Sequence, residues 1–295
     1  MSIQTTQIAL SMMDDIERIR IKNGYITAAH TFASLFIWRK EMGISVYLEE
    51  ELFAAKCEWR GKNAWFFPCG SKKAVRDFVD RIICEEELLF CYMRKEDMDF
   101  LNQEFPRKFK IIEKECDHEY LYDRKEQQEL KGKRFLAARK YIHRLEAGHV
   151  LEWELLCASN LKDAVSVVTK WKEHSEGVGG IKDTTASITL LDNWENLDVS
   201  GIIVRVDGEP SAVMAGYPIG RSMYDISLGK QSCFLSGLAE YTRNTFCSFL
   251  SEEYTLVNGE EDLGIEGLRM MKQLMRPAGQ IQMYEGRINA VEKTG

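Results

Sequence analysis

The sequence predicts a mixed α+β protein that is built from two tandem domains. At 295 residues the chain is longer than a typical single domain of about 100–150 residues. Hydrophobic residues make up 45% of it and charged residues 29%, which is normal for a globular protein with a substantial core. Segments with strand and helix patterns follow one another in nearly the same order in both halves. We therefore expect one domain over residues 1–147 and a second over 148–295, with the boundary near Gly148.

The first half contains helix and strand patterns in alternation. Helices are expected over residues 12–21, 71–84 and 96–105, and an aromatic-rich, buried segment over 30–39. Strands are expected over residues 44–48, 51–58, 63–67, 88–92, 109–112 and 120–122. The charged segment 124–146 is expected to form a helix that bridges the two halves.

The second half repeats this order. Strands are expected over residues 150–157, 199–206, 211–217, 223–228, 253–257 and 280–284. Helices are expected over residues 161–174, 184–196 and 232–250 and from 262 to the proline at 277, with a glycine-rich loop over 175–180. The order is typical of an acyltransferase domain of the Gcn5-related N-acetyltransferase type, so we expect this fold twice in tandem.

Charge and cysteine content narrow the class of protein. The net charge of -7 argues against a protein wrapped in nucleic acid over its whole surface, but it allows a local basic patch. The eight cysteines include no Cys-x-x-Cys pair, so we expect reduced core cysteines in a cytoplasmic protein. The run Cys-Asp-His-Glu at 116–119 places its side chains on alternating faces of a strand, and we therefore expect no metal site.

No targeting or membrane-spanning segment is expected. Asp14, Asp15 and Glu17 interrupt the early apolar residues, which excludes the apolar core of a signal peptide. No uncharged apolar run approaches the roughly 20 residues that a transmembrane helix needs. We therefore expect a soluble protein.

The segment from Val257 to Pro277 has features that helix formation alone does not explain. The turn at Asn258 leads to three adjacent carboxylates (residues 260–262), which favour a helix N-terminus. Gly264 and Gly267 then fall in the first turns of the expected helix, where each glycine costs roughly 1 kcal/mol relative to alanine. Such glycines leave one face bare for the close approach of a ligand or of another backbone. The alternative is close helix-on-sheet packing with an ordinary acidic N-terminus.

Two sets of residues resemble one bacterial family, which is similar to the C-terminal domain of phosphatidylglycerol lysyltransferases. The first set is Asn258, Glu260 or Glu261, Asp262, Leu263, Gly264, Gly267, Leu268, Arg269 and Lys272. The second set is Glu119-Tyr120-Leu121-Tyr122-Asp123, Leu130-Lys131-Gly132-Lys133 and Arg139. The two sets occur in the order of the family. The resemblance implies a tandem acyltransferase layout, shared with the Fem-type aminoacyltransferases that use charged tRNA.

The resemblance also implies roles for the residues of the first set. Glu261 and Asp262 would bind the ammonium of an aminoacyl group or act as the base. Lys272 would neutralise a phosphate or polarise a carbonyl. As catalytic residues we therefore expect Glu261, Asp262 and Lys272, and as donor-binding residues of this set Asn258, Gly264, Gly267 and Arg269.

The expected fold places further residues at the donor slot. Its third meander strand and the following helix carry Tyr224, Asp225, Ser227, Gly229 and Lys230. A glycine just before a helix would let backbone amides meet a phosphate or a carbonyl, whereas the alternative is a simple strand-to-helix turn.

The basic segment of the second set is a candidate contact for a phosphate-rich donor. Lys133 and Arg139 lie there, together with Lys131, Arg134 and Lys140. The acceptor end of a tRNA or coenzyme A would suit this charge. The alternative is a solvated helix whose cations pair with the neighbouring glutamates at 126, 129 and 146.

The chain departs from the family pattern at two places. Leu274-Met275 stand where the family usually has Ser-Tyr, and Arg139-Lys140 where it has Arg-Asn. The loss of a tyrosine hydroxyl near the last helix removes a proton donor or carbonyl contact. We therefore expect either that this chain uses a different donor or acceptor from the family, or that it has lost the activity.

We expect an acyltransferase that moves an aminoacyl group from aminoacyl-tRNA, or an acyl group from acyl-coenzyme A, to an amine or hydroxyl acceptor. The acceptor would be a small molecule, a peptide or a lipid head group. We expect direct transfer rather than a covalent enzyme intermediate, because the sequence shows no Cys–His or Ser–His–Asp grouping. Gly177-Val178-Gly179-Gly180 lacks the Lys-Ser/Thr of a P-loop and is interpreted as a loop over the acceptor side. The alternative from another class is a catalytically silent binding module on the same fold.

Overall fold

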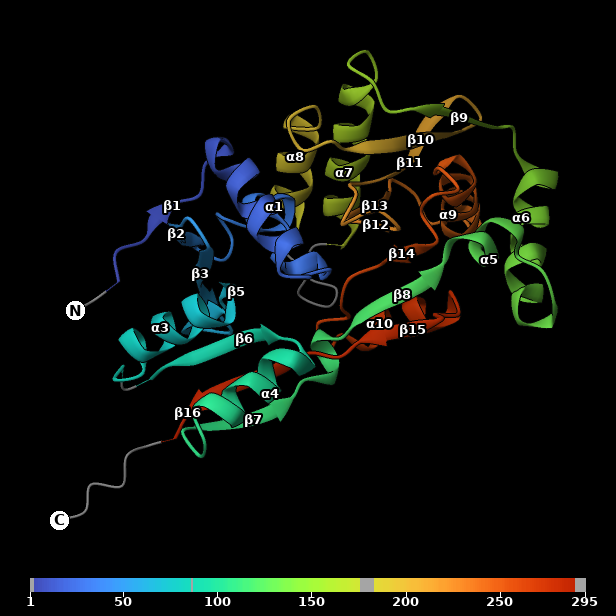
Figure 1. Cartoon of the computed structure of the whole chain (residues 1–295). Coiled ribbons are helices and arrows are strands. Elements are labelled where there is room, and N and C mark those ends of the chain that lie inside the picture. Colours follow the sequence, from blue (N-terminus) through green and yellow to red (C-terminus); the bar gives the residue numbers. More distant parts are fainter. Residues whose placement is uncertain (1–2, 86, 176–182, 290–295) are drawn as a thin grey trace. The chain divides into compact units, whose positions relative to one another are not determined.

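The computed structural model describes residues 3–85, 87–175 and 183–289 (Figure 1). The chain divides into two compact units, Met1–Glu119 with Ile281–Gly295, and Tyr120–Gln280. The tandem-domain boundary near Gly148 stays a prediction, as does the role of the loop at 177–180, which lies outside the described residues.

The first unit is built on one mixed sheet with the strand order β1-β2-β3-β4-β6-β16-β7, in which β5 also pairs with β3. The strands are β1 (Thr6–Gln7), β2 (Ser45–Glu49), β3 (Leu52–Trp59), β4 (Lys62–Phe66), β5 (Cys69–Gly70), β6 (Leu89–Met93), β7 (Phe109–Glu113) and β16 (Tyr284–Ile288). The helices are α1 (Met13–Lys22), α2 (Phe32–Ile37), α3 (Lys72–Ile82) and α4 (Lys95–Glu104). Every residue of α2 is buried, which confirms the predicted buried aromatic segment.

The last strand of the chain corrects one expectation. The single strand expected over 280–284 overlaps β15 (Gly279–Ile281) and only the first residue of β16, most of which was not predicted. Met283, between the two strands, is fully buried, and its carbonyl oxygen accepts a hydrogen bond from Lys114 N. β16 then pairs antiparallel with both β6 and β7, so the C-terminal strand completes the sheet of the first unit.

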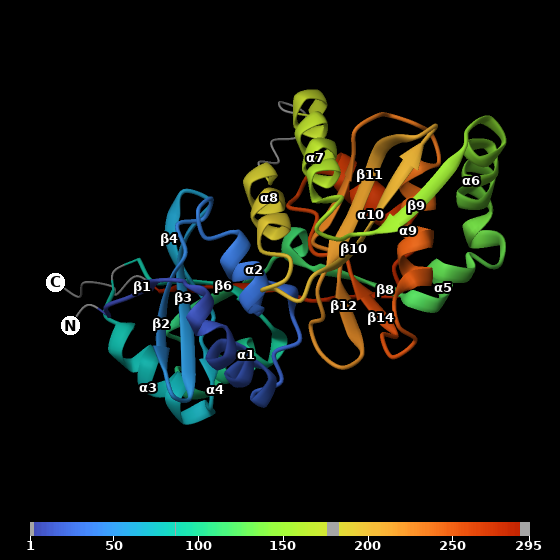
Figure 2. The same cartoon turned by 90° about the horizontal axis from the view of Figure 1, so that it is seen from above.

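The second unit contains two four-stranded sheets, ordered β13-β11-β10-β9 and β12-β14-β8-β15. Their further strands are β8 (Glu119–Asp123), β9 (Leu151–Leu155), β10 (Ser200–Val206), β11 (Glu209–Gly216), β12 (Met223–Asp225), β13 (Leu228–Gln231) and β14 (Leu256–Asn258). The helices are α5 (Arg124–Glu129), α6 (Leu136–Gly148), α7 (Leu161–Ser175), α8 (Thr184–Asp192), α9 (Leu238–Phe249) and α10 (Glu266–Leu274). Figure 2 shows α7 and α9 on opposite faces of the sheet that contains β10 and β11.

Alternate residues of β10 form the core beneath α9. Ile202, Val204 and Val206 pack with Leu238 and Phe246 of that helix. Between them on β10, Ile203 is also buried, because both faces of this sheet are covered, whereas Arg205 is half-buried and pairs with Glu154 and Asp163. Burial on both faces explains the apolar run from Ile202 to Val204.

The strand expected over 223–228 is in fact two strands in different sheets. β12 runs parallel to β14, with Asp225 opposite Asn258, whereas β13 runs antiparallel to β11, with Met214 opposite Gly229. The change of sheet occurs where a Cβ atom on Gly216 would lie 1.8 Å from the carbonyl oxygen of Asp225. A glycine is therefore required for this close crossing.

The charged helix expected over 124–146 is interrupted. α5 ends at Leu130, whose backbone has φ = 48°, and Gly132 follows with φ = 84°. Both values are left-handed, so the helical path cannot continue. A short 3-10 helix, Lys133–Phe135, then leads into α6.

Candidate functional site

The family-like segment 258–272 contains the last residue of β14, the loop 259–265 and most of α10. The helix expected from residue 262 begins only at Glu266, which is a correction. Gly264 precedes it in a left-handed turn with φ = 76°, so it does not lie in a helical turn. Gly267 does lie in the first turn, but a Cβ atom there would meet nothing within 4 Å. Among the described residues, no backbone outside the helix therefore lies close to this position.

Asp262 holds this loop together. Its carboxylate is 1% exposed and accepts hydrogen bonds from Tyr120 Oη (2.8 Å), from Gly264 N (2.8 Å) and from Arg269 Nε (2.8 Å) and Nη2 (3.1 Å). Burial alone would raise the pKa of Asp262, but the hydrogen bonds from Arg269, Tyr120 and Gly264 outweigh it and lower the pKa. A carboxylate that is held in its charged form by four hydrogen bonds is suited to positioning the loop rather than to accepting a proton.

Lys272 is the buried residue of α10, and it points into the unit. Its Nζ donates to the carbonyl oxygens of Gly259 and Glu260, the second at 3.2 Å. Burial lowers the pKa of Lys272, although the carboxylates of Glu260, Glu261 and Asp225 act in the opposite direction. The amine therefore fixes the backbone that carries the acidic residues.

A cluster of charged side chains surrounds Lys272. Its members besides Lys272 are Asp225, Arg243, Glu260 and Glu261. Its three carboxylates are Asp225, Glu260 and Glu261, and Glu260 also acts on Lys230. Asp225 is fully buried at the end of β12. A site of this composition favours a cationic group on a ligand.

Arg243 was not predicted from the sequence. It lies on α9, its guanidinium is 4.0 Å from the centre of the Tyr122 ring, and its Nε donates to Gln127 Oε1 at 3.2 Å. The available signal was its position on the apolar face of the helix, three and four residues before the buried Phe246 and Cys247. A charged side chain at a buried position is rare unless it has a polar or charged partner inside the protein.

The structure gives the residues expected at the donor slot different surroundings. Tyr224 is structural, because its hydroxyl donates to Gly216 O at 2.7 Å. Gly229 lies within β13 and not just before a helix, which is a correction. Ser227 lies between β12 and β13, and its Oγ is 3.5 Å from Glu260 Oε1. The strand change thus places Ser227 beside the charged cluster.

Lys230 forms a second buried charge contact. Its Nζ is 2.5 Å from Asp183 Oδ2 and 3.5 Å from the centre of the Trp171 ring. Burial lowers the pKa of Lys230, while Asp183 and Glu260 act in the opposite direction. Asp183 and Trp171 were missed by sequence reasoning, because only the folded chain brings α7, α8 and β13 together.

Two cations of the basic segment make contacts within the protein. Arg139 Nη1 donates to the carbonyl oxygens of Leu130 and Gly132, so this side chain holds the interruption between α5 and α6. Arg134 pairs with Glu126 at 3.2 Å, as the solvated-helix alternative predicts. Lys133 is exposed.

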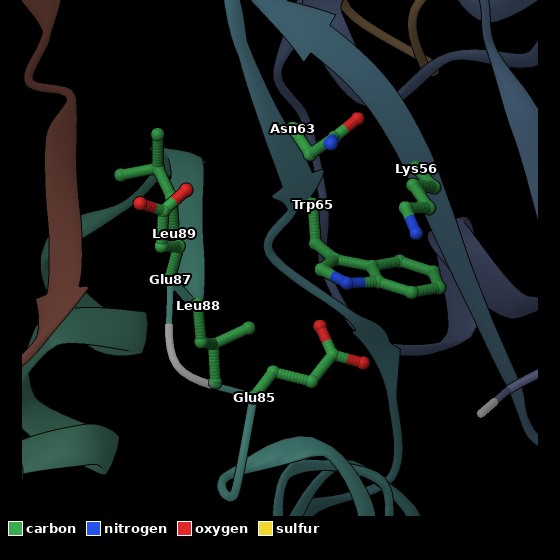
Figure 3. A pocket seen from close by; sticks show the side chains of 7 residues that line it. All are labelled: Lys56, Asn63, Trp65, Glu85, Glu87, Leu88 and Leu89. Atoms are coloured by element: carbon green, nitrogen blue, oxygen red, sulfur yellow. The ribbon is translucent and has the colours of Figure 1, made fainter. Parts of the chain in front are cut away.

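A recess in the first unit does not coincide with these residues. It has a volume of about 160 Å³ and is lined by Lys56, Asn63, Trp65, Glu85, Glu87, Leu88 and Leu89 (Figure 3). Ligand pockets are usually larger, about 300–1,000 Å³. None of the predicted site residues lines it. In the described part of the chain, no group of three metal-ligating side chains lies together.

The fold is of the acyltransferase-like type, and comparison with known proteins identifies the family of the chain. The chain matches the family described as phosphatidylglycerol lysyltransferase, C-terminal, over residues 25–284, and it belongs to that family. None of the curated proteins matches the chain.

Solved structures share this fold along nearly the whole chain. A conserved protein of unknown function from Bacteroides thetaiotaomicron is 23% identical, with a TM-score of 0.88 and coverage of 98% of this chain and 100% of that one. FemX is 10% identical, with a TM-score of 0.63 over 97% and 98% of the two chains. L-PGS from Bacillus licheniformis is 14% identical, with a TM-score of 0.59 over 86% and 90%. The predicted α+β fold of tandem Gcn5-related, Fem-like type is confirmed. Among the described helices, none has the length and apolar character to cross a membrane.

Proposed function

We propose that the chain is an aminoacyltransferase that moves an aminoacyl group from aminoacyl-tRNA to an amine or hydroxyl acceptor. The observation that carries this proposal is the group of three carboxylates, Asp225, Glu260 and Glu261, whose charges act on the buried amine of Lys272. An aminoacyl ester carries a free ammonium, which such a cluster attracts, whereas the acetyl group of acetyl-coenzyme A is neutral. The cluster therefore favours aminoacyl-tRNA over acyl-coenzyme A as the donor.

The edge of β13 provides the group that would polarise the ester carbonyl. Ser232 N donates to Ser211 O at 2.8 Å, so N–H groups of even-numbered residues in β13 point toward β11. The N–H of Gly229 then points to the other edge of the strand, because successive N–H groups alternate in direction. β13 is the end strand of its sheet in the described chain, so this edge has no partner strand. A backbone N–H at that edge can donate to an oxyanion.

The proposed reaction uses these groups as follows. The acceptor amine or hydroxyl attacks the ester carbonyl carbon and gives its proton to a carboxylate of the cluster. The carbon–oxygen bond to the terminal ribose then breaks, and the ribose oxygen takes up a proton. Glu260 and Glu261 would hold the ammonium and receive the proton, while Asp262 and Lys272 keep their loop in place.

The first experiment is a thermal-shift comparison of the purified protein with charged tRNA, uncharged tRNA, coenzyme A and acetyl-coenzyme A. A donor at 100 times its dissociation constant stabilises by about 2.7 kcal/mol, which is readily measured. Glu261→Gln should lose the difference between charged and uncharged tRNA, whereas the matched control Glu266→Gln, on the exposed start of α10, should keep it. A shift with coenzyme A species alone would favour an acetyltransferase. No shift with any donor would favour the silent binding module.

A second experiment separates the positioning role of Asp262 from a role as base. If Asp262 acts through Arg269, Asp262→Asn and Arg269→Met should reduce transfer by similar factors, and the double variant should be no worse than either single one. If Asp262 is instead the base, Asp262→Asn alone should abolish transfer while Arg269→Met retains most of it.

A further inference from the structure

Strand β9 is an end strand of its sheet, and its outer edge has no partner strand in the described structure. Among the described strands, β9 pairs with β10 alone (Figure 2). Leu156 N donates to Gly201 O at 2.8 Å in the register of this pair, so the backbone groups of even-numbered residues point toward β10. The N–H groups of Leu151, Trp153 and Leu155 therefore point outward, because successive residues alternate in direction. This edge can accept another strand.

The side chains of β9 form one apolar face and one acidic face. Leu151, Trp153 and Leu155 lie on the side of the sheet that α9 covers, as do the apolar residues of β10 opposite them. Trp153 is nevertheless 46% exposed and Leu155 48% exposed, since no further strand continues the sheet beside them in the described chain. Glu152 and Glu154 point to the opposite side. A strand that pairs with this edge would meet apolar and acidic side chains in alternation.

The acidic face has little internal neutralisation. Arg205 lies on β10 opposite Glu152, but its guanidinium pairs with Glu154 at 2.7 Å and with Asp163 at 2.5 Å. Among the described residues, the exposed Glu152 forms no ion pair. One guanidinium shared by two carboxylates leaves Glu152 able to bind a cation from outside.

We propose that the outer edge of β9 binds an extended segment of a partner protein in which basic and apolar residues alternate. The segment would add a strand to the sheet through hydrogen bonds with the outward backbone groups of β9. Its apolar side chains would cover Trp153 and Leu155. Its cations would lie opposite Glu152 and Glu154, where a cross-strand pair of opposite charges is stabilising. This binding does not depend on the proposed transfer reaction.

A second copy of the chain suits this edge less well than a basic segment. The sequence of β9, Leu-Glu-Trp-Glu-Leu, reads the same in both directions. An antiparallel pair of copies centred on Trp153 would therefore place Glu152 opposite Glu154 of the second copy, and this would occur on both sides of the centre. Like charges directly opposite each other destabilise a strand pair. Charge complementarity thus favours a basic strand.

The test is fluorescence anisotropy of a labelled synthetic peptide, in which lysine and valine alternate, titrated with the full chain. We expect binding that weakens with added salt. Glu152→Lys should weaken binding by about fivefold or more, whereas the matched control Glu252→Lys, at an exposed glutamate between α9 and β14, should bind as wild type does. Trp153→Lys should also weaken binding. Its control is Ile21→Lys, which changes a residue of the first unit that is 63% exposed.

Residue-resolved amide hydrogen exchange tests the geometry of the pairing. The peptide should slow exchange at Leu151, Trp153 and Leu155, whose N–H groups point outward. The amides of Glu152 and Glu154 should change little, because they already face β10. Methylation of the valine nitrogens of the peptide should abolish binding, since it removes the N–H groups that would face β9.

Four results would overturn the proposal. Wild type that does not bind the lysine–valine peptide would do so, as would equal binding of a peptide with glutamate in place of lysine. Unchanged binding after methylation would exclude strand addition. A concentration-dependent dimer in sedimentation velocity that Trp153→Lys abolishes would assign the edge to a second copy. None of these results bears on donor binding in the thermal-shift experiment, so failure here is distinct from failure of the proposed reaction.

Discussion

Protonation of His30 should destabilise the first unit as the pH falls. The ring is fully buried, its Nε2 lies 3.0 Å from Phe67 O and its Nδ1 lies 3.1 Å from Thr27 Oγ1. These partners assign the proton to Nε2, so the neutral ring is satisfied. Burial lowers the pKa of His30 to about 3, and the cations Arg94 and Arg20 act in the same direction.

The magnitude follows from the difference between this pKa and the ordinary value of 6.5. Because the folded pKa is depressed, the unfolded chain binds the proton first, and stability is lost as the pH falls from about 6.5 toward 3. Each pH unit in this window changes the free energy of unfolding by about 1.4 kcal/mol. Between pH 7 and pH 5, His30 alone should therefore cost about 2 kcal/mol of stability.

Amide hydrogen exchange of peptides from β4 and β5 at pH 7 and pH 5 measures this change in the unit concerned. The variant His30→Gln supplies the comparison, because its amide can still donate to Phe67 O but does not titrate. Protection in the variant should be lower at pH 7 and should change with pH by about 2 kcal/mol less than in wild type. An equal pH dependence in both proteins would refute the assignment of the acid lability to His30.

Two further predictions concern the second unit and can be checked by urea unfolding. Gly216→Ala should destabilise by about 3 kcal/mol or more, because its Cβ atom would lie 1.8 Å from the carbonyl oxygen of Asp225. Gly267→Ala is the matched control and should stabilise by up to about 1 kcal/mol, since nothing lies within 4 Å of its added Cβ atom. Lys230→Met should cost about 3–5 kcal/mol, because it leaves the Asp183 carboxylate without its cation, and adding Asp183→Asn should recover part of this loss.

Local patterns predicted most elements of the fold. Ser71 was expected to open a helix, and its Oγ accepts from Ala74 N at 3.4 Å at the start of α3. β10 and β11 fall within a residue or two of the predicted strands. Such elements are specified by side chains near them in the sequence, and their hydrophobic period is visible without the fold.

The errors occur where long-range packing decides the path of the chain. Apolar residues recur along the whole run 223–228, and the chain changes sheet at the close crossing of Gly216 and Asp225. Most of β16 lies beyond the strand that was expected over 280–284, and its partners β6 and β7 come from a distant part of the sequence. The interruption of the charged helix has a local cause. Gly132 readily adopts the positive φ at which the helix ends, so the sequence itself contains this signal.

The same distinction applies to the candidate site. Resemblance identified the loop from Asn258 to Lys272, because its residues are close together in the sequence. Arg243 and Asp183 come from distant helices and carry no motif of their own. The charge balance of the cluster could therefore be worked out only from the folded unit.

We expect a ligand with a positive charge to stabilise the protein through the carboxylates around Lys272. The carboxylates of Asp225, Glu260 and Glu261 act on the buried amine of Lys272, and we expect them to attract an ammonium that binds beside them. A small amino-acid ester should therefore stabilise the protein more than the matching N-acetylated ester, even without tRNA. Thermal shifts with the two esters measure this difference, and Glu261→Gln should reduce it because the variant removes one carboxylate. Equal shifts from the charged and the neutral ester would show that these carboxylates do not bind an ammonium, whatever donor the protein uses.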